Sequence, residues 1–110
     1  MNHLAPIFAA LSDETRLAVV ERLMRQGAAS AGVLVNHVGK SGPAVSRHLK
    51  VLRQAGIVTQ RVDGTSRVYA IAPEAIQAVA DWTISHRAFW EARLDRLEAV
   101  LAETVGGDDE

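Results

Sequence analysis

The sequence predicts a mainly α-helical fold with a small β-hairpin in a chain of 110 residues. A short helix, a tight turn and a second, capped helix follow one another between Ser30 and Ala55, which is the order of a helix-turn-helix motif. Two β-branched runs then flank Asp63-Gly64, and this is a strong hairpin signal. Together these features predict a winged helix-turn-helix with about five helices, a two-stranded wing and a long C-terminal helix.

The N-terminal part of the sequence predicts two helices. Apolar residues recur at helical spacing in the first eleven residues, and a helix this short must lie on something larger to be stable. Ser12 is expected to N-cap the second helix, which ends at Gln26-Gly27. The expected buried stripe of this second helix is Leu17, Val20, Leu23 and Met24.

The second helix of the helix-turn-helix carries the strongest functional signal. Ser41 is placed to cap it, and Gly56 follows where a helix ends in the left-handed conformation. Val45, Leu49 and Leu52 form one apolar stripe. The opposite face is cationic, has no acidic residue and begins with small side chains; it holds Pro43, Ala44, Ser46, Arg47, Lys50 and Arg53. A DNA major groove accepts such a helix, whereas the alternative, an ordinary solvated helix, usually mixes both charge signs.

The hairpin is predicted to extend this basic surface. With Asp63-Gly64 at the tip, Arg61 lies opposite Ser66 and Gln60 opposite Arg67. The net charge of −1 argues against nucleic acid, but it hides a segregation of charge. Basic residues outnumber acids between positions 40 and 67, and acids outnumber bases after position 72. Because screening confines fields to about 8–10 Å, the basic part keeps a local positive surface.

The C-terminal part is predicted to be one long helix from Pro73 to about Thr104. Its apolar stripe is Ile76, Val79, Ala80, Thr83, Trp90, Leu94, Leu97 and Leu101. One small domain cannot cover this surface, so we expect part of it to pair with a second copy of the chain. Residues 106–110 are expected to form a disordered tail, which leaves a single domain over residues 1–105.

The sequence gives little support for a catalytic or redox function. The chain has no cysteine, which excludes disulfides and fits a reducing cytoplasm. No catalytic triad order, zinc-protease motif or glycine-rich phosphate loop is visible, so we do not expect an enzyme. His48 lies at the edge of the buried stripe and is expected to be half-buried and bonded to a backbone group. No signal peptide or membrane span is predicted.

Several motifs resemble the ArsR/SmtB family of dimeric winged-helix transcription regulators, which are mostly repressors. These motifs are Ser12-Asp-Glu-Thr-Arg-Leu17, Ala44-Val-Ser-Arg-His-Leu-Lys-Val-Leu52, Ala55-Gly-Ile-Val58 and Arg67-Val-Tyr69. The resemblance runs from about Leu4 to Leu101, and Glu14 departs from it where many relatives have proline. It implies that the first and last helices form the dimer interface, through Leu4, Ile7, Phe8, Trp90, Leu94, Leu97 and Leu101.

The metal sites of this family are not matched. Many relatives bind metals through a Cys-x-Cys pair, whose positions Ser30 and Gly32 hold here. Others use a ligand set on the last helix, where Asp81 is followed by Thr83, Leu94 and Leu97. We therefore expect no metal and no other cofactor, as in the metal-independent relatives. The effector stays open between an apolar ligand, a protein partner and control by expression level.

The sequence thus predicts a cytoplasmic, homodimeric DNA-binding regulator, most simply a repressor of a near-palindromic operator that can include its own operon. The expected DNA-contacting residues are Lys40, Ser41, Pro43, Ala44, Ser46, Arg47, Lys50, Arg53, Arg61 and Arg67. Arg47 is the candidate for bonding guanine, because its planar fork can reach O6 and N7 together. The alternative is a winged-helix protein-interaction module without sequence-specific DNA binding.

Overall fold

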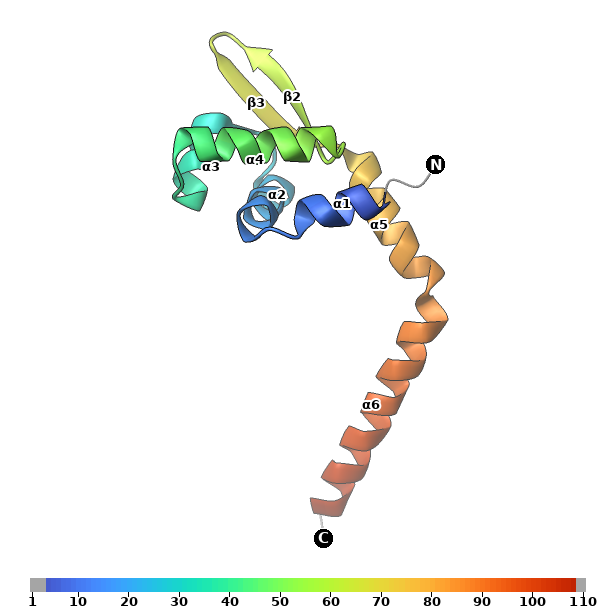
Figure 1. Cartoon of the computed structure of the whole chain (residues 1–110). Helices are drawn as coiled ribbons and strands as arrows, with labels where there is room; N and C mark the ends of the chain where they lie inside the picture. The colour runs from blue at the N-terminus through green and yellow to red at the C-terminus, as the bar shows by residue number, and fades with distance from the viewer. Residues whose placement is uncertain (1–3, 109–110) are drawn as a thin grey trace. The chain divides into compact units, whose positions relative to one another are not determined.

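The computed structural model describes residues 4–108. Within them the elements run α1 (Leu4–Leu11), α2 (Glu14–Gln26), β1 (Ala29–Ser30), α3 (Ala31–Val38), α4 (Gly42–Gln54), β2 (Val58–Asp63), β3 (Ser66–Ile71), α5 (Pro73–Ser85) and α6 (Arg87–Asp108) (Figure 1). The predicted fold class, mainly helical with a hairpin, is confirmed. The described part of the chain has one more helix and one more strand than predicted.

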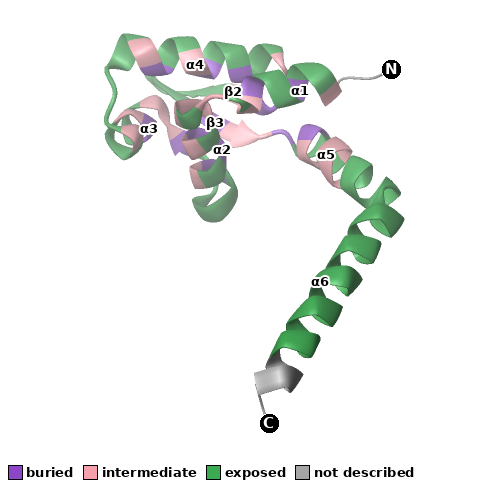
Figure 2. Cartoon of the chain, turned by 60° about the horizontal axis from the view of Figure 1, so that its bottom comes forward, coloured by how far each residue is buried: buried purple, intermediate pink, exposed green. Residues whose placement is uncertain are grey.

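The chain divides into two compact units, Met1–Ala78 and Val79–Glu110. The single domain expected over residues 1–105 stays a prediction. The described side chains of α6 are exposed on all sides, so none of them joins a core within its own unit (Figure 2). Helix α6 continues through residues 106–108, which were expected to belong to a disordered tail; residues 109–110 lie outside the described residues.

The core of the first unit lies between α1, α2, α3, α4 and the base of the sheet. Its most deeply buried side chains are Ile7, Val19, Val20, Leu34, Val45, Leu49, Leu52 and Ile57. The predicted stripe of α2 is partly wrong, because Leu17 and Met24 are exposed. The buried face begins instead at half-buried Arg16 and continues through Val19, Val20 and Leu23. These residues keep helical spacing. Val20 and Leu23 are shared with the predicted stripe, whereas Arg16 and Val19 were not part of it.

Helix α2 is capped by Asp13. The prediction that Ser12 caps it is wrong. The Asp13 carboxylate accepts the backbone N–H of Arg16 at 3.0 Å from Oδ2, which satisfies one free donor of the first turn. The Ser12 hydroxyl instead donates to the carbonyl of Ala9 at 2.7 Å and closes the end of α1. Two adjacent residues that are both good caps thus serve two different helices.

The sheet has the strand order β1-β3-β2 and is antiparallel throughout. Strand β1 pairs with the middle of the hairpin through Ala29 and Tyr69, and it leads directly into α3. At the base of the hairpin the N–H of Ala72 donates to the carbonyl of Ile57 at 2.8 Å. The hairpin is therefore fixed at its base to the helix-turn-helix, while its other end projects from the helices (Figure 1).

The predicted hairpin turn is wrong by one residue, which changes every cross-strand partner by two residues. Asp63 is the last residue of β2 and pairs with Ser66, so the turn is Gly64-Thr65. Gly64 has a φ of 63°, and a positive φ at the first central position alone is the pattern of a type II′ turn, which favours glycine there. The actual partners are Arg61 with Val68 and Val62 with Arg67.

The predicted helix from Pro73 to Thr104 is interrupted at His86. The carbonyl of Trp82 accepts the Ser85 hydroxyl and the His86 Nδ1, each at 2.8 Å. The backbone N–H of His86 bonds to Thr83 at 3.2 Å instead of continuing the α-helical pattern. Side-chain donors have thus replaced a backbone donor at the helix end, which ends α5 and lets α6 begin at Arg87.

Candidate nucleic-acid interface

Helix α4 has the two faces that the sequence predicted. Val45, Leu49 and Leu52 are at most 1% exposed, and they fix the helix on the core of the first unit. The other face is open to solvent: Pro43, Ser46, Arg47, Lys50 and Arg53 are exposed and Ala44 is half-buried. This helix contains no acidic residue. A rigidly held helix therefore presents a continuous cationic surface.

Both ends of α4 are fixed by local sequence. At the start, the Ser41 hydroxyl oxygen accepts the N–H of Ala44 at 3.2 Å, so this predicted DNA-contacting residue is the cap of the helix. At the end, Gly56 has a φ of 76°, and the N–H groups of Gly56 and Ile57 bond back to Arg53 and Leu52, each at 3.0 Å. This is a Schellman motif, with Ile57 buried beneath it.

The turn between α3 and α4 is equally defined. Gly39 takes the left-handed conformation, with a φ of 67°, and ends α3 through a bond to Val35. Lys40 follows it and is exposed directly before α4. Because only glycine adopts this conformation cheaply, the turn sets the direction in which α4 leaves α3.

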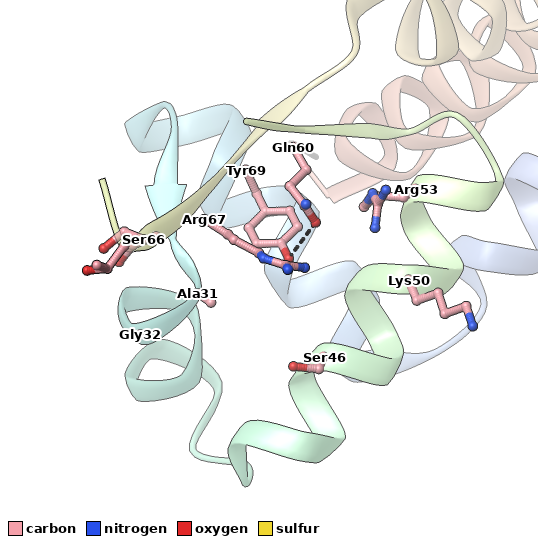
Figure 3. Close-up of a pocket in the computed structure, with 11 residues that line it drawn as sticks. Ala31, Gly32, Ser46, Lys50, Arg53, Gln60, Ser66, Arg67 and Tyr69 are labelled. Carbon is pink, nitrogen blue, oxygen red and sulfur yellow. Dashed lines mark hydrogen bonds between the residues drawn. The ribbon is translucent and has the colours of Figure 1, made fainter. Parts of the chain in front are cut away.

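A groove of about 690 Å³ separates α4 from the hairpin. Most of its lining side chains are polar or cationic, and none is a carboxylate. The lining consists of Ser30, Ala31, Gly32, Ser46, Lys50, Arg53, Gln60, Thr65, Ser66, Arg67 and Tyr69. Figure 3 shows Lys50 and Arg53 on α4, with Arg67 reaching in from the hairpin. The groove therefore joins the cationic face of α4 to the wing.

The register places the two wing arginines on opposite faces of the hairpin. Side chains alternate along a strand, and Arg67 shares its face with Tyr69 and Gln60, which line the groove. Arg61 pairs with Val68 on the other face, where its guanidinium lies 3.8 Å from the Asp63 carboxylate. Only Arg67 of these two lines the groove beside α4.

Sequence reasoning missed the residues that build the floor and end of this groove. The Tyr69 hydroxyl donates to Gln60 Oε1 at 3.0 Å, and the tyrosine is almost fully buried (Figure 3). Thr65 and Ser66 come from the turn. Strand alternation places Gln60, Arg67 and Tyr69 on one face in the predicted register and in the actual one, but it does not show that this face lies beside α4. Ser30 and Gly32, considered earlier only as metal-site positions, line the groove as well.

His48 is half-buried, as predicted, but its partner is a side chain and not a backbone group. A terminal nitrogen of Arg16 lies 3.2 Å from His48 Nδ1, and the Asp13 carboxylate lies 3.8 Å from the same atom. The pKa of Asp13 is lowered, chiefly because its carboxylate accepts the backbone N–H of Arg16, although partial desolvation opposes this shift; the nearby His48 and Arg16 lower it further. No local sequence signal pointed to this contact.

The expected dimer residues fall into two groups. Ile7 is 2% exposed and belongs to the core of its own unit, while Phe8 is 40% exposed and Leu4 is half-buried. The expected residues of α6 are all exposed: Trp90, Leu94, Leu97 and Leu101. Ile7 therefore leaves almost no surface for a partner, whereas the α6 residues leave a large one.

The part of the chain that the structure describes contains neither a metal cluster nor a membrane helix. Among residues 4–108, no three histidine or carboxylate side chains gather in a way that could hold a metal ion. None of the described helices is long and apolar enough to cross a membrane.

Comparison with known proteins identifies the class. A family model for a helix-turn-helix domain matches residues 11–61. The HTH-type transcriptional regulator Rv2034 of Mycobacterium tuberculosis is 47% identical over 70 residues, which are 64% of this chain and 64% of that protein. The arsenical resistance operon repressor of Escherichia coli is 33% identical over 103 residues, which are 92% of this chain and 86% of the repressor.

Solved structures agree with these relatives. The crystal structure of the ArsR family transcriptional regulator RHA00566 has a TM-score of 0.71 and 34% identity, covering 81% of this chain and 91% of that one. A homodimeric winged helix-turn-helix DNA-binding domain from Mycobacterium bovis has a TM-score of 0.63 and 27% identity, covering 76% and 83%. The fold and the cationic α4 surface are thus those of a winged-helix DNA-binding transcriptional regulator. The chain belongs to the ArsR family.

Proposed function

We propose that this regulator acts as a homodimeric repressor that binds a near-palindromic operator, including one upstream of its own operon. The observation that carries the proposal is the continuity of the cationic surface: the exposed face of α4, the groove and Arg67 adjoin one another, with no carboxylate among the groove-lining residues. Twofold symmetry would place two copies of α4 in successive major grooves, about 34–36 Å apart.

The exposed residues of α4 divide into base-reading and phosphate-binding roles. Arg47 is fully outside the apolar stripe and can bond guanine O6 and N7 together. Ser46 contacts a base or a phosphate, and Pro43 and Ala44 meet thymine methyl groups. Lys40, Lys50 and Arg53 bind phosphates and fix the register of the protein on the duplex. Arg67 contacts the DNA backbone from the wing, and Arg61 contributes less to DNA binding.

The proposed dimer rests on exposed apolar surface. On α6, Trp90, Leu94, Leu97 and Leu101 follow one another at spacings of four, three and four, which is the spacing of a helix-pairing seam. Leu94 is 58% exposed in the single chain, and contiguous exposed apolar surface marks an interaction site. The similar domain from Mycobacterium bovis, which is described as homodimeric, supports this arrangement.

Selection from a random DNA pool tests the DNA part of the proposal. We expect the wild-type protein to enrich a duplex with two inverted half-sites and to shift it in a gel. Arg47→Ala should lose about 1–3 kcal/mol of preference for that duplex over random DNA, while Arg25→Ala, which removes an exposed arginine from α2, should not. Retained preference in Arg47→Ala would show that the base contact is assigned wrongly.

The same experiment addresses the alternative function. A protein-interaction module would enrich no DNA sequence, and its DNA binding would depend on salt but not on sequence. Enrichment of a half-site together with repression of a reporter placed behind it supports the repressor. Activation of that reporter would contradict repression while leaving sequence-specific binding intact.

Sedimentation tests the dimer. Leu94→Asp combined with Leu97→Asp should convert a dimer into a monomer at micromolar concentration, because two charges would enter the proposed interface. The matched control, Ala92→Asp with Ala99→Asp, adds the same charge on the opposite side of α6 and should remain dimeric. A monomeric wild type would overturn the proposal.

A further inference from the structure

Arg16 connects three helices of the first unit. It lies in the first turn of α2, where its Nε donates to the carbonyl of Ala10, near the end of α1, at 2.6 Å. A terminal nitrogen of the same guanidinium lies 3.2 Å from Nδ1 of His48, in the middle of α4. One half-buried side chain thus contacts α1, which the family resemblance places at the dimer interface, and α4, the helix proposed to read DNA.

The chemistry of this contact fixes the state of His48. A guanidinium has only donors, so the bond to Arg16 requires an unprotonated Nδ1 on a neutral imidazole, which then carries its proton on Nε2. The Asp13 carboxylate is 3.8 Å from Nδ1, beyond hydrogen-bond distance, and it accepts the backbone N–H of Arg16. Asp13 and Arg16 are the charged neighbours of His48 on α2, and α1 contributes the Ala10 carbonyl and no charged side chain.

The position of His48 makes this contact relevant to DNA reading. It lies between Arg47, the proposed guanine contact, and Leu49, a core residue. On α1, Phe8 is exposed on the helix that ends beside Arg16. The Ala10 carbonyl belongs to the backbone of α1, and the imidazole is carried by α4. The guanidinium therefore joins α1 to α4 through polar bonds, in addition to the direct packing of these two helices.

We propose that Arg16 is a positioning residue that, through neutral His48, sets the orientation of α4 relative to α1 and hence the separation of the two α4 helices in the dimer. The inference rests on the proposed homodimeric DNA binding. It assigns Arg16 no contact with DNA. Its loss should therefore alter which spacing between half-sites is recognised more than it alters the binding of one half-site.

The state of His48 can be measured without DNA. Long-range proton–nitrogen NMR spectra of the imidazole should show a neutral ring with its proton on Nε2 in the wild type at neutral pH. Arg16→Met keeps the length of the side chain without its donors and should give a mixture of the two neutral tautomers. Arg22→Met is the matched control, since Arg22 is also on α2 and bonds one backbone carbonyl, that of Gly27. A proton on Nδ1 in the wild type, or identical His48 spectra in wild type and Arg16→Met, would overturn the proposal.

The coupling itself is measured on DNA that the wild type enriches from a random pool. Three probes are used: that duplex, the same duplex with one base pair inserted between the half-sites, and a single half-site. The wild type should prefer the first over the second by about tenfold, within the range of energetic couplings between sites. Arg16→Met should lose most of this preference and bind the single half-site like the wild type, while Arg22→Met should keep the preference.

Two substitutions of His48 test whether its acceptor nitrogen is needed for the spacing preference. His48→Asn keeps an acceptor close to the position of Nδ1 and should retain the spacing preference, whereas His48→Leu removes the acceptor and should lose it. Thermal unfolding shows that each variant is folded before it is scored. A wild type without any spacing preference contradicts both the coupling and the proposed twofold recognition. A preference that persists in Arg16→Met and His48→Leu contradicts the coupling alone.

Discussion

Tyr69 and Gln60 face each other across the two strands of the wing, and the tyrosine hydroxyl donates to Gln60 Oε1 at 3.0 Å. The tyrosine ring is almost fully buried, so the bond ties a side chain of the groove floor to the core of the first unit. A hairpin of two strands alone is marginally stable in water. This bond and the short pairing with β1 hold the wing in place beside α4.

Tyr69→Phe should therefore weaken the wing without emptying the core. The loss of one partly buried hydrogen bond should lower the free energy of unfolding by about 0.5–1.5 kcal/mol in urea titrations. The matched control is Thr59→Val, which removes a hydroxyl bonded at 3.5 Å to the Ala70 carbonyl on the exposed side of the hairpin. An equal loss in both variants would mean that the Tyr69 bond has no special role.

The two wing arginines should differ in their contribution to DNA binding. Arg67→Ala should lower affinity and reduce the salt dependence by about 0.9 in slope, the value for one lost phosphate contact. Arg61→Ala should have a smaller effect, since Arg61 points to the face away from the groove and has Asp63 as a neighbour. Fluorescence anisotropy between low and physiological salt measures both. The assignment of faces fails if the two substitutions change the slope equally.

Substitutions of Leu49 and Val51 on α4 should distinguish the stability that comes from core packing from the stability that comes from surface contacts. Leu49→Ala should cost about 2–5 kcal/mol of stability, because it leaves a cavity beneath the helix. Val51 is 37% exposed, and Val51→Ala should cost well under half as much. Thermal or chemical unfolding followed by circular dichroism gives both values. A small loss in Leu49→Ala would indicate that the surrounding helices collapse into the space.

The Asp13 cap should stabilise the folded chain at neutral pH and lose this stabilising effect in acid. Because the pKa of Asp13 is lowered in the folded chain, the unfolded chain takes up the proton first as the pH falls. The contribution is complete above the ordinary aspartate range, near pH 4, and is lost as the pH falls further towards the lower folded pKa.

Asp13→Asn tests this directly, since asparagine caps helices about as well as aspartate but does not titrate. The variant should unfold at a temperature close to that of the wild type at neutral pH and should lose less stability between pH 5 and about pH 3. A parallel decline in both proteins would show that the acid sensitivity comes from other carboxylates.

Local signals in the sequence were enough to predict α4 and the existence of the wing. A serine cap and a terminal glycine delimit α4, and its apolar spacing identified the buried face. The turn was misplaced because both Asp63-Gly64 and Gly64-Thr65 satisfy known turn preferences, and the choice depends on pairing further along the strands.

The remaining differences come from interactions that local patterns do not encode. The apolar spacing continues past His86, but the side chains of Ser85 and His86 take over the Trp82 carbonyl and end α5. Arg16 and His48 are 32 positions apart in the chain, and they meet only because α2 and α4 pack together. The pairing of β1 involves two residues, too few to leave a strand pattern.

The position of β3 between β1 and β2 separates the length of the wing from the identity of its groove face. Side chains alternate along β3, and Tyr69 is held on its face by burial and by pairing with Ala29 of β1. An extra residue after Thr65 would therefore be taken up in the exposed turn, and Arg67 and Tyr69 would keep their side of the strand. In the evolution of such regulators, the tip of this hairpin can change in length while the groove-facing side chains are preserved.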